Sequence, residues 1–278
     1  MVIENKEEII EMIIIGEKIN GSIPAVAEAI AARDAEFIKN RAKAQAEAGA
    51  TFIDCCASVP EAEEVETLKW MIECIQEATD LPIAVDSPSA DVIKEAYKFC
   101  NKEGIINSVS GEGSKVDTIF PLIADTKWGV ICLLSDDTGI PKTAADRLKV
   151  FDYIMSKAKE YNISPDRLYI DPLVEMLCTS EDGMAMNVEV MNTIRKQYPD
   201  IHLTAAVSNI SFNLPVRKLV NLGYTVLAMN AGLDSAILDP LNRDMMGVIY
   251  ATEALLGLDD YCMEYIGAYR EGIFGPQK

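Results

Sequence analysis

Three polar residues that end short apolar runs have side chains suited to binding a flat heterocycle. Asp86 follows Ile-Ala-Val, Asn107 follows Gly-Ile-Ile and Asp171 follows Leu-Tyr-Ile. An ionised carboxylate only accepts hydrogen bonds, whereas a carboxamide both donates and accepts them. This set can pair with the N1, N3–H, 2-amino and N8–H groups along the edges of a pterin ring. Each residue alone could instead cap the following helix, but their shared placement favours a binding site.

The apolar runs that hold these residues recur along the chain, with a helical pattern between successive runs. Each run has Asn, Asp or Ser at or close to its end: Ile13–Asn20, Thr51–Cys56, Ile83–Ser87, Gly104–Ser108, Val130–Asp136, Leu168–Pro172, Ala205–Asn209 and Val226–Asn230. Runs rich in Ile, Val, Leu and Ala without strict alternation are typical of parallel strands covered on both faces. Repeated strand–helix units predict a (β/α)8 TIM barrel of the α/β class, which carries its functional groups at the C-terminal ends of the strands.

The expected barrel strands are Met12–Glu17, a strand ending at Asp54, Pro82–Val85, Ile105–Asn107, Gly129–Leu134, Leu168–Ile170, His202–Val207 and Thr225–Met229. Helices are expected near Arg33–Ala48, Pro60–Thr79, Ala90–Asn101, Ser114–Thr126, Thr143–Tyr161, Val188–Tyr198, Pro215–Leu222 and Leu241–Leu256. The length of 278 residues suits one domain over 1–278, because such barrels have about 250 residues. We expect the barrel over about 12–256 and a C-terminal helix and tail over 257–278, frayed from Gly272.

Composition narrows the possible functions. The net charge of −19 repels phosphate backbones and anionic lipid, which disfavours binding to nucleic acid or a membrane surface. The first ten residues do not resemble a signal peptide, and no apolar run approaches the ~20 residues of a membrane span. An odd count of cysteines without C-x-x-C indicates buried thiols in a soluble, cytoplasmic protein: Cys55, Cys56, Cys74, Cys100, Cys132, Cys178 and Cys262. Adjacent cysteines without a nearby histidine are not a zinc site, so we expect no metal site.

Seven motifs carry a resemblance to a known family: GEKIN, IAVDS, INS, TGIPK, LYIDPL, SN-x-S and GLDSAI-x-D, spread from about Met12 to Tyr265. They resemble the methyltetrahydrofolate:corrinoid protein methyltransferases, which are pterin-binding barrels. The resemblance implies transfer of a methyl group between N5 of tetrahydrofolate and the cobalt of cobalamin on a separate corrinoid protein. It further implies a homodimer, with tetrahydrofolate or 5-methyltetrahydrofolate as substrate, and leaves the direction of transfer open.

The resemblance also assigns site residues. Asp86, Asn107 and Asp171 match the pterin-binding positions, and Asn209 matches the asparagine that hydrogen-bonds near N5, which makes it the candidate catalytic residue. Further candidates for the pterin site are Glu17, Asn20, Asp54, Ser208, Phe212 and Arg217. The sequence departs from the family pattern at Cys56, where Asn is frequent. It departs again at Phe212, where Gln is usual, and this ring could stack on the pterin or exclude solvent.

Two other functions stay open. The sister enzyme dihydropteroate synthase binds a pyrophosphate and has a basic R-x-H element at the end of its eighth strand. The expected eighth strand here runs into Ala228-Met229-Asn230-Ala231-Gly232 without a cation, which places the synthase second. The other alternative is a non-catalytic folate-binding barrel.

The single histidine, His202, is expected at the start of strand seven, away from the site, which disfavours a histidine acid–base mechanism. Residues 200–205 nearly match the cobalt-ligating D-x-H-x-x-G motif but end in Ala205. We therefore expect cobalamin to arrive on another protein.

Overall fold

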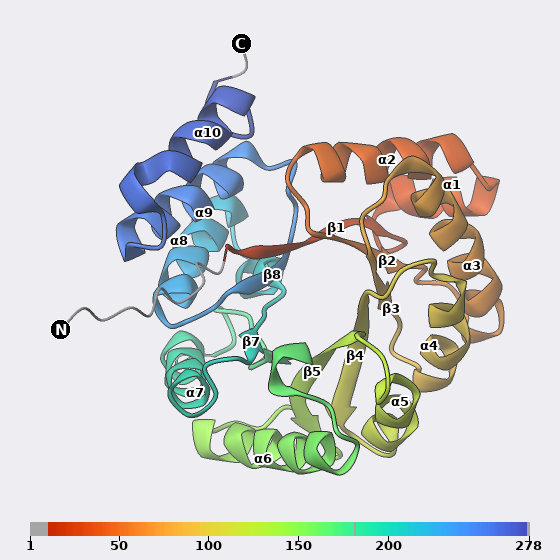
Figure 1. Cartoon of the computed structure of the whole chain (residues 1–278), viewed down its shortest axis with the longest axis horizontal. Coiled ribbons are helices and arrows are strands. Elements are labelled where there is room, and N and C mark those ends of the chain that lie inside the picture. Colours follow the sequence, from red (N-terminus) through yellow and green to blue (C-terminus); the bar gives the residue numbers. More distant parts are fainter. Residues whose placement is uncertain (1–10, 181, 277–278) are drawn as a thin grey trace.

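The structure, a computed structural model, describes residues 11–180 and 182–276, so the expectations for the first ten and last two residues lie outside it. The strands of this part form one parallel sheet in the order β7-β6-β5-β4-β3-β2-β1-β8. Their bounds are β1 Ile13–Asn20, β2 Phe52–Cys56, β3 Ile83–Asp86, β4 Ile105–Gly111, β5 Gly129–Asp136, β6 Leu168–Asp171, β7 His202–Leu203 and β8 Ser235–Leu238. Figure 1 shows the strands surrounded by helices, and the expected (β/α)8 barrel is confirmed.

The sheet closes between β7 and β8 by a short, irregular contact. Ala206 and Ile237 form an isolated parallel bridge. The Ile237 N–H donates to the Ala205 carbonyl at 2.9 Å, and the Asp234 N–H donates to the Leu203 carbonyl at 3.3 Å. The strand expected over 202–207 is therefore only two residues long. The segment after the bridge forms the 3₁₀ helix η3 (Val207–Ser211) at the C-terminal end of the barrel.

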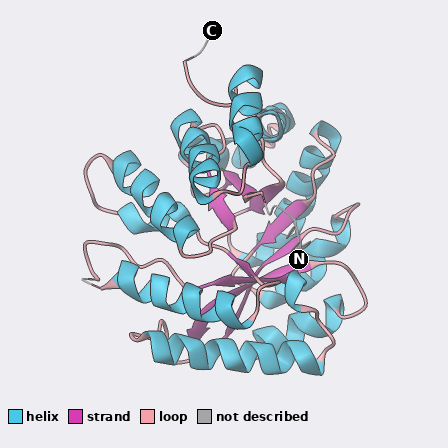
Figure 2. Cartoon of the chain, turned by 60° about the vertical axis from the view of Figure 1, so that its left-hand side comes forward, coloured by secondary structure: helices cyan, strands magenta, loops and turns pink. Residues whose placement is uncertain are grey.

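Helices cover the outside of the sheet, as the turned view in Figure 2 also shows. Their bounds are α1 Pro24–Ala32, α2 Ala35–Glu47, α3 Glu61–Ala78, α4 Ala90–Ala96, α5 Lys115–Ile123, α6 Ala144–Glu160, α7 Gly183–Gln197, α8 Arg217–Asn230, α9 Arg243–Leu256 and α10 Met263–Glu271. Polar side chains set several of the starts, because they accept hydrogen bonds from free backbone N–H groups. Asp34, Thr143 and Asn242 cap α2, α6 and α9 in this way. Helix α1 was not expected from the sequence.

The expected eighth strand, Thr225–Met229, is wrong. These residues belong to α8, whose buried residues Tyr224, Thr225, Ala228 and Met229 recur with helical spacing. A short apolar run such as Val-Leu-Ala-Met fits a helix or a strand equally well. The true β8, Ser235–Leu238, pairs with β1 and lies in the GLDSAI-x-D motif.

The C-terminal helix expected after Gly257 is α10, which contacts α9. The expected fraying from Gly272 is wrong for the described residues up to 276. Phe274 is buried, its ring lies 5.8 Å from that of Tyr250 on α9, and its carbonyl accepts a 3.0 Å hydrogen bond from Arg243.

The cysteines are all free thiols. Cys55, Cys56, Cys74 and Cys132 are buried, as expected, whereas Cys178 and Cys262 are exposed and Cys100 is half-buried. In the stretches 11–180 and 182–276, no helix is both long and apolar enough to cross a bilayer.

Apolar side chains fill the inside of the barrel and separate its two ends. Buried Ile15, Ala84, Ile105, Ile131 and Tyr169 form this interior cluster. A larger core lies between the sheet and the helices. Successive strand residues point to opposite faces, so the interior cluster also identifies which residues further along each strand point toward the barrel axis.

Candidate active site

Polar side chains form a layer directly above the apolar interior, at the C-terminal ends of the strands. We call this end the mouth of the barrel. Each polar residue follows an interior apolar residue by two positions and so shares its face of the sheet. The pairs are Ile15 and Glu17, Phe52 and Asp54, Ala84 and Asp86, Ile105 and Asn107, Tyr169 and Asp171, and Ile237 and Asp239. The fold therefore brings together five of the sequence-predicted site residues.

Asp54, Asp86 and Asn107 form one side of the mouth, on neighbouring strands. Asp86 and Asn107 are register partners, and the Asn107 Nδ2 donates to Asp54 Oδ1 at 3.1 Å. Asp54 is buried, and desolvation together with the charge of Asp86 raises its pKa well above the usual range. Burial also raises the pKa of Asp86 to about 6. Carboxyl groups held in this way favour a ligand that supplies hydrogen-bond donors.

Cys56 lies beside Asp86 in the register of β2 and β3. Its thiol donates to Asp86, which partly offsets the effect of burial on the pKa of that carboxyl. Burial and the neighbouring carboxylate raise the pKa of Cys56 itself, so it stays a thiol. Where the family frequently has Asn, this chain therefore keeps a weak hydrogen-bond donor next to Asp86.

Asp171 lies across the mouth at the end of β6 and is 5% exposed. Its Oδ1 accepts a 2.7 Å hydrogen bond from the Leu173 N–H. Burial raises the pKa of Asp171 to about 6, while this hydrogen bond and the charge of Arg147 act against the rise. Asp171 is therefore ionised at neutral pH, with one oxygen fixed by the backbone of its own loop.

Glu17 joins β1 to the segment that carries Asn209. Its Oε2 accepts from the Ser208 hydroxyl at 3.4 Å. Burial, followed by the charge of Asp239, raises the pKa of Glu17 to about 7. Asp239 itself pairs with Lys18 at 3.2 Å. Glu17 can therefore gain or lose a proton near neutral pH, beside the candidate catalytic segment.

Asn209 lies in η3 at the C-terminal end of the barrel and is half-buried. Arg217 stabilises this turn, because its Nη2 donates to the Ser208 carbonyl at 2.8 Å and its Nε donates to the Ser211 hydroxyl at 3.0 Å. The Arg217 guanidinium also lies 4.6 Å from the ring centre of Phe212, which is 43% exposed. Arg217 and Phe212 thus form the rim next to Asn209.

Asn20 is the least central of the predicted site residues. Its Oδ1 accepts from the Ser58 hydroxyl at 3.2 Å and from the Ser22 N–H at 2.9 Å. The Ser58 hydroxyl in turn contacts the Cys56 sulfur at 3.3 Å. The contacts of Asn20 link the loops after β1 and β2.

Sequence reasoning missed Arg147 and Asp239. Arg147 is fully buried on α6. The sequence does contain a sign of this role, because Arg147 is a cation on the buried face of α6. The other buried residues of that face are Ala144, Val150, Phe151, Ile154 and Ala158. Asp239 is the last residue of the GLDSAI-x-D motif, but the expected eighth strand, Thr225–Met229, ends before it, so the sequence predicts no site role for it. The residue that follows the true β8 is this anion. The absence of a cation was predicted for the end of α8, and the residues that follow β8 are Asp239, Pro240 and Leu241.

Known families and proteins resemble this chain over most of its length. The model for pterin binding enzymes matches residues 24–239. A methylcorrinoid:tetrahydrofolate methyltransferase of Eubacterium limosum is 47% identical over 267 residues, which cover 95% of this chain and 98% of that protein. The methionine synthase of Mycobacterium tuberculosis is 27% identical over 251 residues, covering 84% of this chain and 21% of that longer protein.

Solved structures with the same fold include two dihydropteroate synthases. The enzyme from Xanthomonas albilineans has a TM-score of 0.63 at 17% identity, covering 89% of this chain and 94% of that one. The enzyme from Vibrio fischeri has a TM-score of 0.65 at 19% identity, covering 90% and 94%. This chain belongs to the pterin-binding enzyme family, which confirms the resemblance inferred from its motifs.

Proposed function

We propose that this protein transfers a methyl group from a methylcorrinoid to N5 of tetrahydrofolate. The observation that carries the proposal is 47% identity, across nearly the full length of both chains, to a methylcorrinoid:tetrahydrofolate methyltransferase. The name of that relative favours the direction toward tetrahydrofolate, which the sequence motifs left open. The polar mouth supports the proposal because it presents acceptors and a carboxamide to the edge of a pterin.

Asp86, Asn107 and Asp171 would bind the pterin edge. The Asn107 Nδ2 donates to Asp54, which leaves its Oδ1 free to accept from a ring N–H. The Leu173 N–H occupies one oxygen of Asp171, so the other oxygen is the one that would accept from the ligand. A site arranged in this way discriminates strongly against ligands without matching donors, since buried acceptors would otherwise lack partners.

The reaction is a displacement at the methyl carbon. The N5 lone pair forms the new carbon–nitrogen bond, the electron pair of the carbon–cobalt bond stays with cobalt, and the N5 proton leaves. Asn209 would orient N5 by hydrogen bonding, through position and electrostatics. Glu17 is our candidate proton acceptor, because it contacts the neighbour of Asn209 and its pKa is about 7.

The methylcorrinoid is proposed to arrive on a separate corrinoid protein that docks over the mouth. The exposed ring of Phe212 and the guanidinium of Arg217 lie on the rim next to Asn209, where such a partner would approach. The homodimer and the cytoplasmic location expected from the sequence stay predictions.

The test is to mix the protein anaerobically with methylcobalamin and tetrahydrofolate. We expect the methylcobalamin spectrum to convert to that of cob(I)alamin, with formation of 5-methyltetrahydrofolate in equal amount. Folate binding without methyl transfer in either direction would favour the non-catalytic barrel. Condensation of p-aminobenzoate with a pterin pyrophosphate would instead identify a dihydropteroate synthase.

A further inference from the structure

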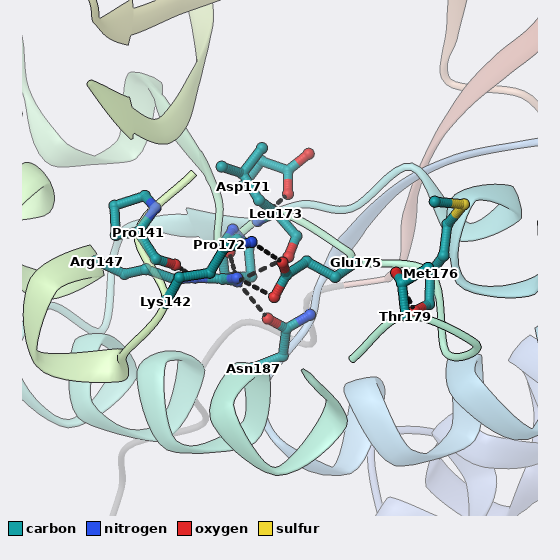
Figure 3. Close-up of polar contacts among 10 residues, drawn as sticks. All are labelled: Pro141, Lys142, Arg147, Asp171, Pro172, Leu173, Glu175, Met176, Thr179 and Asn187. Atoms are coloured by element: carbon teal, nitrogen blue, oxygen red, sulfur yellow. Dashed lines mark hydrogen bonds and ion pairs between the residues drawn. The ribbon is translucent and has the colours of Figure 1, made fainter. Parts of the chain in front are cut away.

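Arg147 of α6 is a buried cation that binds backbone rather than standing in the mouth itself. Its guanidinium donates to five acceptors, shown in Figure 3. These are the Pro141 carbonyl at 3.2 Å, the Pro172 carbonyl, the Leu173 carbonyl at 2.7 Å, Asn187 Oδ1 at 2.9 Å and Glu175 Oε2 at 2.9 Å. The loops after β5 and β6 and helix α7 therefore meet at one side chain.

Leu173 connects Arg147 to Asp171. The Leu173 carbonyl accepts from Arg147, and the Leu173 N–H donates to Asp171 Oδ1. Leu173 has a φ of 67°, a left-handed conformation that is unfavourable for a residue with a side chain. Hydrogen bonds on both sides of the residue hold this conformation. Figure 3 shows the second carboxylate oxygen of Asp171 turned away from the Arg147 cluster.

The charge of Arg147 also acts on Asp171. Burial raises the pKa of this carboxyl, and Arg147 lowers it toward its ordinary range. Arg147 therefore helps to keep Asp171 ionised at neutral pH, which is the form that accepts hydrogen bonds from a pterin.

The same loop continues to the candidate catalytic segment. The Leu177 N–H donates to the Ile210 carbonyl at 3.0 Å, and the Cys178 thiol lies 3.5 Å from the Phe212 carbonyl. Ile210 directly follows Asn209. A change in the loop after β6 can therefore affect both Asp171 and the segment that carries Asn209.

We infer that Arg147 is a positioning residue for the folate site, where it holds the loop after β6 so that Asp171 presents one oxygen to the pterin and η3 stays in place beside it. This inference rests on the proposed function, because it assigns the role of Arg147 toward the same ligand.

Arg167 provides a matched control. It lies before β6, at the opposite end of the barrel from Asp171, and also binds backbone carbonyls. Its donors contact the carbonyls of Trp128 at 3.0 Å, Ile123 at 2.5 Å and Ala124 at 3.4 Å. Loss of Arg167 should lower stability without affecting Asp171.

The experiment measures tetrahydrofolate binding from pH 5 to 8.5, together with thermal unfolding, for wild type, Arg147→Met, Arg147→Lys and Arg167→Met. Arg147→Met should bind tetrahydrofolate roughly tenfold more weakly or worse at pH 7, because Asp171 loses both its fixed orientation and a neighbouring positive charge. The pH below which it loses binding should also move upward. Arg147→Lys keeps the charge but not the planar fork, so it should bind more weakly with a pH midpoint near that of wild type. Arg167→Met should keep both the affinity and the midpoint.

A folded Arg147→Met variant with wild-type affinity and pH midpoint would overturn the inference. If that variant fails to fold, Arg147→Lys decides the matter, and unchanged affinity there has the same meaning. Absence of tetrahydrofolate binding in the wild type would count against the proposed function instead, because the inference concerns only how that binding is organised.

Discussion

Asp234 at the N-terminal end of the barrel and the pair Asp54 and Asp86 at the mouth are carboxyl groups in opposite surroundings. At the N-terminal end, Asp234 accepts from the Leu203 N–H at 2.7 Å and pairs with Arg195 at 3.1 Å and His202 at 3.0 Å. At the mouth, burial raises the pKa of both Asp54 and Asp86, the charge of Asp86 raises that of Asp54 further, and the described residues provide no salt bridge to either of them. Buried charge that stabilises a fold is normally compensated within the protein. Carboxyl groups at the mouth that lack salt-bridge partners and have raised pKa values therefore point to a ligand.

His202 belongs to the N-terminal end of the barrel. It opens β7, as expected from the sequence, and its ring stacks on Tyr169 with centroids 4.6 Å apart. Tyr169 belongs to the apolar interior, and Asp171, two residues further along β6, belongs to the mouth. One short strand thus carries both environments.

The largest expected effect is the loss of folate binding when a mouth carboxylate is removed. Asp86→Ala or Asp171→Ala should weaken binding by roughly 100-fold or more, because hydrogen bonds to charged groups are lost. The control at the other end, Asp234→Asn, should lower the free energy of unfolding by roughly 2–4 kcal/mol and leave folate affinity unchanged. Calorimetric titration measures the folate affinity, and urea unfolding measures the free energy of unfolding. If both alanine variants bound folate with wild-type affinity, the mouth carboxylates would not be ligand-binding groups.

Asn209→Ala should separate chemistry from binding within the mouth. The methyl-transfer rate should fall roughly 100-fold, as for loss of one oriented polar group, while folate affinity changes much less. Single-turnover kinetics measure the methyl-transfer rate, and an equilibrium binding titration measures the folate affinity. Equal losses in both would assign Asn209 to binding alone.

Glu17→Gln tests whether the titratable group on β1 takes part in the reaction. The wild-type rate should rise with pH through about 7, as the Glu17 carboxylate forms. The glutamine variant should lose this rise and be slower by roughly 100-fold above pH 7, the lower range for general base catalysis. A pH–rate profile that is the same in both proteins would rule out this role.

The smallest expected effect is on stability. The Asp171 pKa is raised to about 6 in the folded protein, so between about pH 4 and 6 the folded state binds more protons than the unfolded state. The ligand-free protein should therefore lose free energy of unfolding as pH rises through this window, by roughly 2 kcal/mol from this group. Urea unfolding across the window should show this slope, reduced in Asp171→Asn. An equal slope in the variant would show that Asp171 does not contribute.

Much of the mouth could be predicted from the sequence, because Asp86, Asn107 and Asp171 directly follow strand-like apolar runs. Strand β8 could not, since its four residues are less conspicuous than the apolar run inside α8. Asp239 was missed for the same reason. The role of Arg147 could not be predicted from local patterns, because it donates to backbone carbonyls of a loop about 25 residues away in the sequence. Local patterns place side chains on faces, but they do not show which carbonyls a loop will turn inward.

The contact between β7 and β8 is short, so the two sides of the mouth differ in how many ladder hydrogen bonds hold their strands. The side built from β2, β3 and β4 has continuous ladders, whereas β7 pairs with β6 at two positions and meets β8 through an isolated bridge. Asn209 lies in η3, three residues after Ala206 of this bridge. Small adjustments there break few ladder hydrogen bonds, so the part of the mouth that carries Asn209 can shift more readily than the part that carries Asp54, Asp86 and Asn107.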